Sequence, residues 1–357
     1  MKVKLFVTLL AFAWSAPSLA LEKSLINQAI SDVSSGLYTG IDSILIYENS
    51  KLVSDYYFNN FDKEQLHQTR STFKSIFGLL AAIAIDKKIL SPEEHIQPLI
   101  SRYLITDNTD FRKTQIRVKD LLNMTSGLDC SEMPGTGPYH DEDVDNGPEP
   151  LKYSLSIAMA TEPGKEWKYC NANSFLLGVT ISAALDRAQQ PNIKDFTRTN
   201  LFNPLGISEY RIYQSPDGFL YAQGNARFKP RDLAKFGLLV LNRGQWQGRQ
   251  IISSQHIDFI LDGVVETHWS WTDLINKHSA SKAKYAYQWY QTIFELGKLS
   301  VPVSHTWGNG GQFIFVVPSL DIVIVFTGSN YGNIDKQKQA FEIMHKYLLP
   351  AASTFNK

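Results

Sequence analysis

The sequence predicts an α+β fold, with one antiparallel sheet built from both ends of the chain, flanking helices and an inserted, mainly helical part. Three observations predict it: β-rich runs near the start, helical periodicity in the middle, and β-rich runs that return before a closing helix. The 357 residues are 43% hydrophobic and 20% charged, which is typical of a globular chain.

The first β-rich runs are Ile41 to Tyr47 and Lys51 to Phe58, and the turn residues Asn49-Ser50 between them predict a hairpin. The clearest helix is expected from about Ser71 to Lys87, where apolar residues recur at helical spacing. Two more helices are expected in the middle of the chain: Phe175 to Leu185 and Asp232 to Arg243.

The later strands are expected at Tyr287 to Phe294, Gln312 to Pro318 and Ile322 to Gly328, before a helix from Gln337 to Leu349. The sheet part is therefore expected to span about 21–65 and 285–357, and the helical part about 66–284. Together they form one predicted domain, 21–357.

Residues 1–20 have the pattern of a cleavable signal peptide. A basic start precedes the apolar run Leu5 to Trp14, and the small residues Ser18 and Ala20 favour cleavage near Ala20. A short membrane anchor is the alternative, although the run is too short for a stable span. We therefore expect a periplasmic or secreted protein without a stable membrane span after signal cleavage.

The formal net charge of the whole chain is zero, and removing the signal residues leaves about −2. This balance does not favour a nucleic-acid partner. The two cysteines, Cys130 and Cys170, lie beside candidate site motifs, and an even pair in an exported chain favours a disulfide over two unrelated buried thiols.

The segment Ser131 to Pro150 is rich in proline, glycine and acidic residues, and it is expected to be a long loop. Asp141, Asp143 and Asp145 alternate as in a calcium loop, but the spacing of the glycine is wrong and the twelfth position is Lys152. A solvated acidic loop is the better interpretation, and no metal or organic cofactor is expected.

A serine hydroxyl needs a base within hydrogen-bond reach to act as a nucleophile, and Ser-x-x-Lys places both on one helix face. The motif occurs at Ser71/Lys74, Ser279/Lys282 and Ser281/Lys284. Only Ser71 opens an apolar helix, whose dipole and burial would favour a neutral, basic Lys74. The alternative is a helix-capping serine with a surface lysine.

Two further segments have residues suited to a hydrolase site. Tyr169-Cys170-Asn171 follows Pro163-Gly164 and precedes a helix, so its phenol and amide are expected on a loop, where Tyr169 would relay a proton or simply pack on the core. The second segment runs from His305 to Gln312 into a β-rich run, and its glycines would let a substrate approach the backbone or merely form a turn.

Taken in order, these segments resemble the serine hydrolases that include class C β-lactamases, DD-peptidases and 6-aminohexanoate-dimer hydrolases. Further matches are Leu121–Leu128, Asn203–Ile207, Asp232–Gly237, Tyr287–Tyr290 and Gly310-Gly311-Gln312. The resemblance spans about residues 35–350, more than coincidence of short motifs explains. It implies a β-lactamase/transpeptidase-like fold with the substrate between sheet and helical part.

The resemblance also implies roles for individual residues. Ser71 takes the place of the acylated nucleophile, Lys74 of its base, Tyr169 of the proton shuttle and Asn171 of the amide that orients the substrate carbonyl. Counting back from Gly310-Gly311, the Lys-Thr-Gly triplet of the family falls on His305-Thr306-Trp307, so His305 and Trp307 are expected to line the substrate site. Gly308 falls on the second oxyanion donor, to within about one residue.

The chain departs from the family at this triplet, because His305 stands where a lysine helps to hold the anionic group of β-lactams. The sequence therefore predicts a serine hydrolase of small amide, ester or peptide substrates, similar to 6-aminohexanoate-dimer hydrolases or esterases. A β-lactamase or peptidoglycan DD-peptidase is one alternative, and a non-catalytic peptidoglycan-binding sensor is another. The oligomeric state and the physiological substrate are not specified by the sequence.

Overall fold

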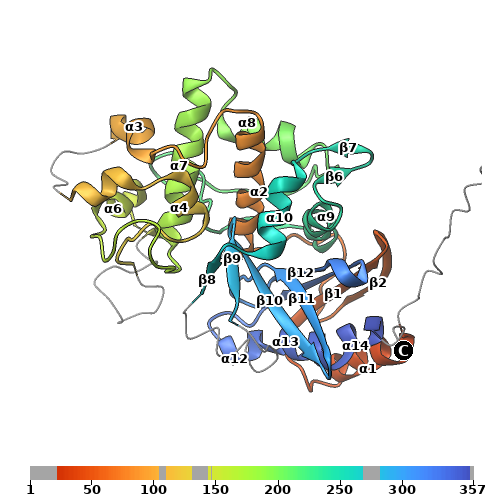
Figure 1. Ribbon diagram of the computed structural model, residues 1–357. Helices are drawn as coiled ribbons and strands as arrows, with labels where there is room; N and C mark the ends of the chain where they lie inside the picture. The colour runs from red at the N-terminus through yellow and green to blue at the C-terminus, as the bar shows by residue number, and fades with distance from the viewer. Residues whose placement is uncertain (1–21, 104–109, 131–143, 146, 268–281, 354–357) are drawn as a thin grey trace, which may run out of the picture.

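In the computed structural model, the strands of both chain ends form one eight-stranded sheet in the order β2-β1-β13-β12-β11-β10-β9-β8 (Figure 1). The structure describes residues 22–103, 110–130, 144–145, 147–267 and 282–353. Neighbouring strands are antiparallel throughout, and β13 near the C-terminus pairs with β1 near the N-terminus. The predicted fold class is therefore confirmed. The signal-peptide residues lie outside the described residues.

The strands of this sheet include the predicted hairpin, and the sheet reaches back to Val265, earlier than the expected start near residue 285. Its strands are β1 (Ile41–Glu48), β2 (Lys51–Tyr57), β8 (Val265–Glu266), β9 (Lys284–Ala286), β10 (Trp289–Leu296), β11 (Leu299–His305), β12 (Phe313–Val317) and β13 (Ile322–Gly328). Smaller sheets contain β3 (His67–Gln68), β4 (Tyr210–Arg211) and β5 (Arg227–Phe228), and β6 (Gln245–Trp246) and β7 (Arg249–Gln250).

The helices lie on both faces of the sheet and in the part inserted between β2 and β8 (Figure 1). The α-helices are α1 (Lys23–Ser34), α2 (Thr72–Asp86), α3 (Ile96–Ile100), α4 (Val118–Leu122), α6 (Pro150–Ser156), α7 (Asn171–Arg187), α8 (Ile193–Thr197), α9 (Pro230–Leu241), α10 (Ser254–Asp262), α12 (Ile334–Gln337), α13 (Gln339–Ile343) and α14 (Leu349–Ser353). Shorter turns are the 3₁₀ segments η1 (Ser101–Tyr103), η2 (Phe111–Gln115) and η5 (Pro318–Leu320) and the π segments η3 (Arg198–Phe202) and η6 (Met344–Leu348).

Residues of the central strands alternate between two hydrophobic cores. In β12, Phe313 and Phe315 pack with the C-terminal helices, whereas Ile314 and Val316 pack on the side of α9. Because successive side chains of a strand point to opposite faces, a strand that is apolar throughout is covered on both sides. Gly237 of α9 permits that close cover, since a Cβ there would lie 2.7 Å from Ile314 Cγ2.

Helix α2 runs through the interior rather than along a surface. Its residues from Thr72 to Ala84 are all buried, so the expected helix is enclosed on every side. It packs against α7, and its N-terminal residue Thr72 reaches the end of β11 through hydrogen bonds. The N-terminus of α2 is thereby held where the sheet meets the helical part.

The C-terminal segment is helical but is divided into α12, α13, η6 and α14, instead of the single expected helix. These turns and α1 cover the sheet face opposite α9 (Figure 1). Within the described residues, none of the helices combines the length and the apolar character needed to span a bilayer.

Candidate active site

Ser71 and Lys74 lie within direct hydrogen-bond distance. Ser71 immediately precedes α2, and Lys74 Nζ lies 2.8 Å from Ser71 Oγ. Lys74 is 1% exposed, whereas Ser71 is only half-buried. The Ser71 side chain makes no capping hydrogen bond to the helix, so the capping-serine interpretation does not describe this pair. A base within hydrogen-bond distance of the hydroxyl is the arrangement that a serine nucleophile requires.

The amine of Lys74 is held in place from two other directions. Its Nζ donates a hydrogen bond to the backbone carbonyl of Gln223 at 2.8 Å, and it lies 4.8 Å from the ring centroid of Tyr169. Tyr169 is itself 6% exposed and packs against Trp167. The structure therefore brings together Ser71, Lys74 and Tyr169, all three of the predicted catalytic residues.

The turn that presents Ser71 has an unusual backbone. Arg70 has φ +48°, a left-handed conformation that costs a non-glycine residue about 1–2 kcal/mol. The preceding Thr69 is anchored through its N–H and hydroxyl, which both donate to the carbonyl of Ala226, at 2.9 and 3.1 Å. This strained, anchored turn places the hydroxyl of Ser71 at the start of the helix.

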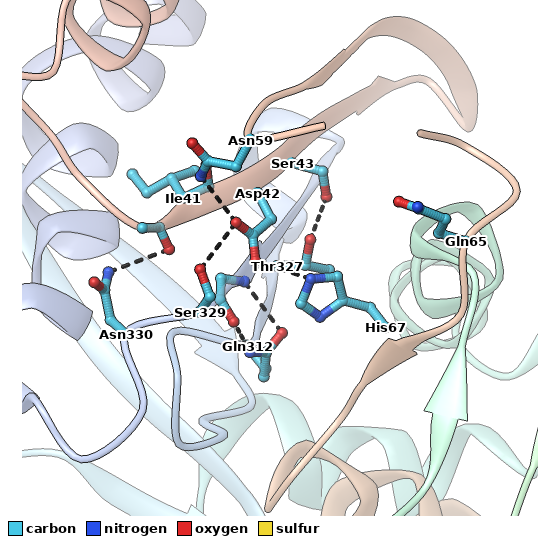
Figure 2. Close-up of polar contacts among 12 residues, drawn as sticks. Ile41, Asp42, Ser43, Asn59, Gln65, His67, Gln312, Thr327, Ser329 and Asn330 are labelled. Atoms are coloured by element: carbon cyan, nitrogen blue, oxygen red, sulfur yellow. Dashed lines mark hydrogen bonds and ion pairs between the residues drawn. The ribbon is translucent and has the colours of Figure 1, made fainter. Parts of the chain in front are cut away.

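A buried polar cluster ties this turn to the sheet (Figure 2). Asp42 of β1, which is fully buried, accepts hydrogen bonds from His67 Nε2 at 3.0 Å, Asn59 Nδ2 at 2.9 Å and Ser329 Oγ at 3.1 Å. We call these four residues the Asp42 cluster. Because His67 lies four residues before Ser71, the cluster connects the nucleophile turn to both terminal strands.

Asn171 is the first residue of α7, and its side chain belongs to a group of polar contacts that the sequence did not predict. Asn171 Nδ2 lies 3.4 Å from Asp145 Oδ2, and Gln223 Nε2 donates to Asp145 Oδ1 at 2.9 Å. Asp145 thus links Asn171 to the segment whose carbonyl holds Lys74. The available signal was the acidic loop, most of which lies outside the described residues, and no motif marked Gln223.

Cys130 and Cys170 form the predicted disulfide, with their Cα atoms 5.7 Å apart. The bond connects the segment after α4 to the residue between Tyr169 and Asn171. It closes a long loop and so removes conformational freedom from the unfolded chain.

His305 and Trp307 face away from α2. His305 is fully buried between the rings of Tyr290 and Phe341, and Trp307 packs on Phe341 and donates a hydrogen bond to Gln337. Their burial argues against the predicted substrate contacts. The intervening Thr306 points to the other face.

Thr306 Oγ1 lies 3.1 Å from Thr72 Oγ1, the first residue of α2, and accepts a hydrogen bond from the backbone N–H of Ile314 at 2.9 Å. In this triplet, Thr306 is therefore the residue that joins the sheet to the nucleophile helix. No sequence motif marked Thr306 for this contact.

Gly308 was predicted to supply an oxyanion donor, but its N–H donates to the carbonyl of Gln312 at 2.8 Å. That hydrogen bond occupies the donor, which argues against the predicted role of Gly308. A Cβ at Gly308 would lie 2.3 Å from the Thr69 carbonyl oxygen, so this glycine permits close packing beside the nucleophile turn. Gly310 and Gly311 have φ +98° and +96° and reverse the chain between β11 and β12.

The burial of His305 leads to a pH prediction. Burial lowers the pKa of His305 from its usual range to about 3, whereas the unfolded value is about 6.5. Below about pH 6.5 the His305 ring is therefore protonated in the unfolded chain but stays neutral in the folded chain. The free energy of unfolding consequently decreases as the pH falls from about 6.5 towards 3.

The variant His305→Gln should show a flatter dependence of the free energy of unfolding on pH between about 6.5 and 4, by up to about 1.4 kcal/mol per pH unit. Urea denaturation of both proteins at a series of pH values measures this difference. Parallel pH profiles would contradict it.

Comparisons with known proteins match nearly the whole chain. A family model described as beta-lactamase covers residues 38–347. The 6-aminohexanoate-dimer hydrolase of Paenarthrobacter ureafaciens is 22% identical over 295 residues, which cover 80% of this chain and 72% of that protein.

Two solved structures show the same fold. An octameric penicillin-binding protein homologue from Pyrococcus abyssi has a TM-score of 0.67 at 16% identity, covering 90% of this chain and 77% of the other. A class C beta-lactamase mutant has a TM-score of 0.65 at 14% identity, covering 92% and 96%. At these identities the structural likeness shows the fold alone.

Proposed function

Because the chain belongs to the beta-lactamase family, a family of serine hydrolases, we propose that it hydrolyses an amide or ester through an acyl-enzyme on Ser71. The observation that carries this proposal is the 2.8 Å distance between Lys74 Nζ and the hydroxyl of the half-buried Ser71. The ring of Tyr169 lies over the same amine, with Lys74 Nζ 4.8 Å from the ring centroid, so this tyrosine neighbours the proposed base.

In the proposed reaction, Ser71 Oγ attacks the substrate carbonyl while neutral Lys74 accepts the hydroxyl proton. The backbone N–H of Ser71 helps to stabilise the oxyanion. Tyr169 gives a proton to the leaving amine or alcohol and regains one from Lys74. Water then attacks the acyl-enzyme, which releases the acid and restores the Ser71 hydroxyl.

We propose small amides and esters as substrates, in line with the 6-aminohexanoate-dimer hydrolase relative. The position that carries the lysine of β-lactamases is here His305, whose ring is enclosed in the core and carries no charge to the site. This difference disfavours β-lactams. A periplasmic or extracellular location is also proposed, and the Cys130–Cys170 disulfide is consistent with it.

The proposal is tested with a fluorophosphonate probe, which phosphonylates activated serines with loss of fluoride. We expect one label per chain, mapped to Ser71 by mass spectrometry, and no label in Ser71→Ala. The matched control is Ser279→Ala, which removes the serine of another Ser-x-x-Lys match and should leave labelling intact. Full labelling of Ser71→Ala, with its activity retained, would overturn the proposal.

Hydrolysis of p-nitrophenyl esters, short amide oligomers and nitrocefin separates the substrate classes. We expect turnover of esters or amides and little turnover of nitrocefin. Efficient nitrocefin hydrolysis would favour a β-lactamase instead, and inertness towards every acyl donor with retained muropeptide binding would favour a sensor.

A further inference from the structure

Arg70, the residue directly before the nucleophile, occupies a backbone position that suits glycine better. Its φ of +48° strains any residue with a Cβ, and strained residues of this kind gather at functional sites. An arginine in such a position suggests that its side chain has a task of its own. The guanidinium group is the chemically distinctive part of that side chain.

The guanidinium of Arg70 lies beside the loop that follows β11. It stacks on the ring of Tyr331, 5.0 Å from the ring centroid. The ring of Tyr331 packs against Gly310, where a Cβ would lie 2.7 Å from the ring. Gly308 of the same loop packs against Thr69, so this loop contacts both the turn that carries Arg70 and the tyrosine on which Arg70 stacks.

A second arginine, Arg227 of β5, pairs with Gln68 of β3, two residues before Arg70. Burial raises the pKa of the Tyr331 phenol, and the positive charges of Arg70 and Arg227 act in the opposite direction. Arg227 also stands directly opposite Arg211 of β4, a like-charge pair that is unfavourable without a counter-ion.

These arginines differ from most others in the described part of the chain, which pair with carboxylates: Arg102, Arg112, Arg117, Arg187, Arg198, Arg231 and Arg243. Among the described residues, neither Arg70 nor Arg227 forms an ion pair, and Arg70 Nε is buried without a hydrogen-bond partner. Asp42 is the acid whose charge raises the pKa of Tyr331, and it is fully buried and already accepts three hydrogen bonds.

We propose that Arg70, assisted by Arg227, binds a carboxylate of the substrate, so that the enzyme prefers acyl groups that end in a free carboxylate. This inference rests on the proposed acylation of Ser71. A guanidinium offers a planar pair of donors that matches a carboxylate. Tyr331 is 41% exposed and both arginines are half-buried, so a small anion can reach this surface. The charge comes from the turn before α2, not from the strand position of His305.

The kinetic test uses two esters with the same number of acyl carbons, mono-4-nitrophenyl adipate and 4-nitrophenyl hexanoate. For the wild-type protein, kcat/KM should be about 10- to 100-fold higher for the adipate ester. In Arg70→Gln this ratio should fall towards one, and Arg70→Lys should keep only part of it because lysine lacks the planar fork. Arg102→Gln, which removes a remote surface arginine, should keep the wild-type ratio.

A binding test separates this inference from the proposed function. Adipate is titrated into Ser71→Ala and into Ser71→Ala/Arg70→Gln by calorimetry, where no acylation is needed. We expect at least about tenfold weaker binding in the second protein. Equal binding to both, or a wild-type ester ratio near one, overturns the carboxylate site and leaves acylation of Ser71 standing. Loss of Ser71 labelling with retained, Arg70-dependent adipate binding overturns the hydrolase and supports the site.

Discussion

Lys74→Ala is expected to lower kcat/KM for a p-nitrophenyl ester by about 10³-fold or more, because it removes the base of the proposed acylation step. The amine lies 2.8 Å from Ser71 Oγ and is almost fully buried, so solvent cannot readily replace it. Lys74→Arg should be nearly as slow, although it keeps the positive charge, because a guanidinium does not give up its proton in proteins.

The double variant Ser71→Ala/Lys74→Ala provides the sharper part of this test. If the two side chains act as one unit, removing both should be no worse than removing the more damaging one alone. Steady-state kinetics of the two single variants and the double variant measure this. Losses that multiply in the double variant would show that Lys74 acts independently of Ser71. Lys282→Ala, from another Ser-x-x-Lys match, is the matched control and should retain activity.

The proximity of Ser71 and Lys74 was predictable because it depends on local geometry. Residues three apart on a helix share a face, and the apolar run after Ser71 predicted that helix. The hairpin of β1 and β2 was predictable for the same reason, since its turn residues lie between its strands. The prediction of the disulfide needed one further premise, namely that the protein is exported to an oxidising compartment.

The orientation of His305 and Trp307 was not predictable from their strand. They lie two residues apart and so share a face, with Thr306 on the other face. Both faces of the sheet are buried, so the apolar pattern carries no signal for which face meets α2. The expectation came from aligning a family triplet, and the burial of both rings argues against it. The engaged N–H of Gly308 depends on hairpin register, which the glycines alone do not determine.

Contacts between distant segments were also beyond the sequence. Gln223 and Asp145 are 78 positions apart, and neither belongs to a motif that marks their hydrogen bond. The same holds for Arg70, whose left-handed backbone lies in the short turn between β3 and α2. Contacts between such distant polar residues can be identified only once the fold is known.

The largest expected effect on stability comes from the Asp42 cluster, for which Asp42→Ala should lower the free energy of unfolding by about 3–5 kcal/mol. The carboxylate is fully buried and accepts from His67, Asn59 and Ser329 (Figure 2). Its removal leaves these buried donors without an acceptor, and water cannot easily enter to replace it. Urea denaturation with the disulfide intact measures the change.

A graded series distinguishes the charge of Asp42 from its shape. Asp42→Asn keeps one acceptor oxygen but turns an amide towards His67 Nε2, which must then become an acceptor and place its proton on Nδ1. That nitrogen is buried without a partner among the described residues, so the variant should lose about 1–3 kcal/mol, less than Asp42→Ala. The matched control is Asp186→Ala, which breaks an exposed pair with Arg102 and should cost about 1 kcal/mol or less. An equal loss of unfolding free energy in Asp42→Ala and Asp186→Ala would show that the Asp42 cluster does not hold the turn before Ser71 against the terminal strands.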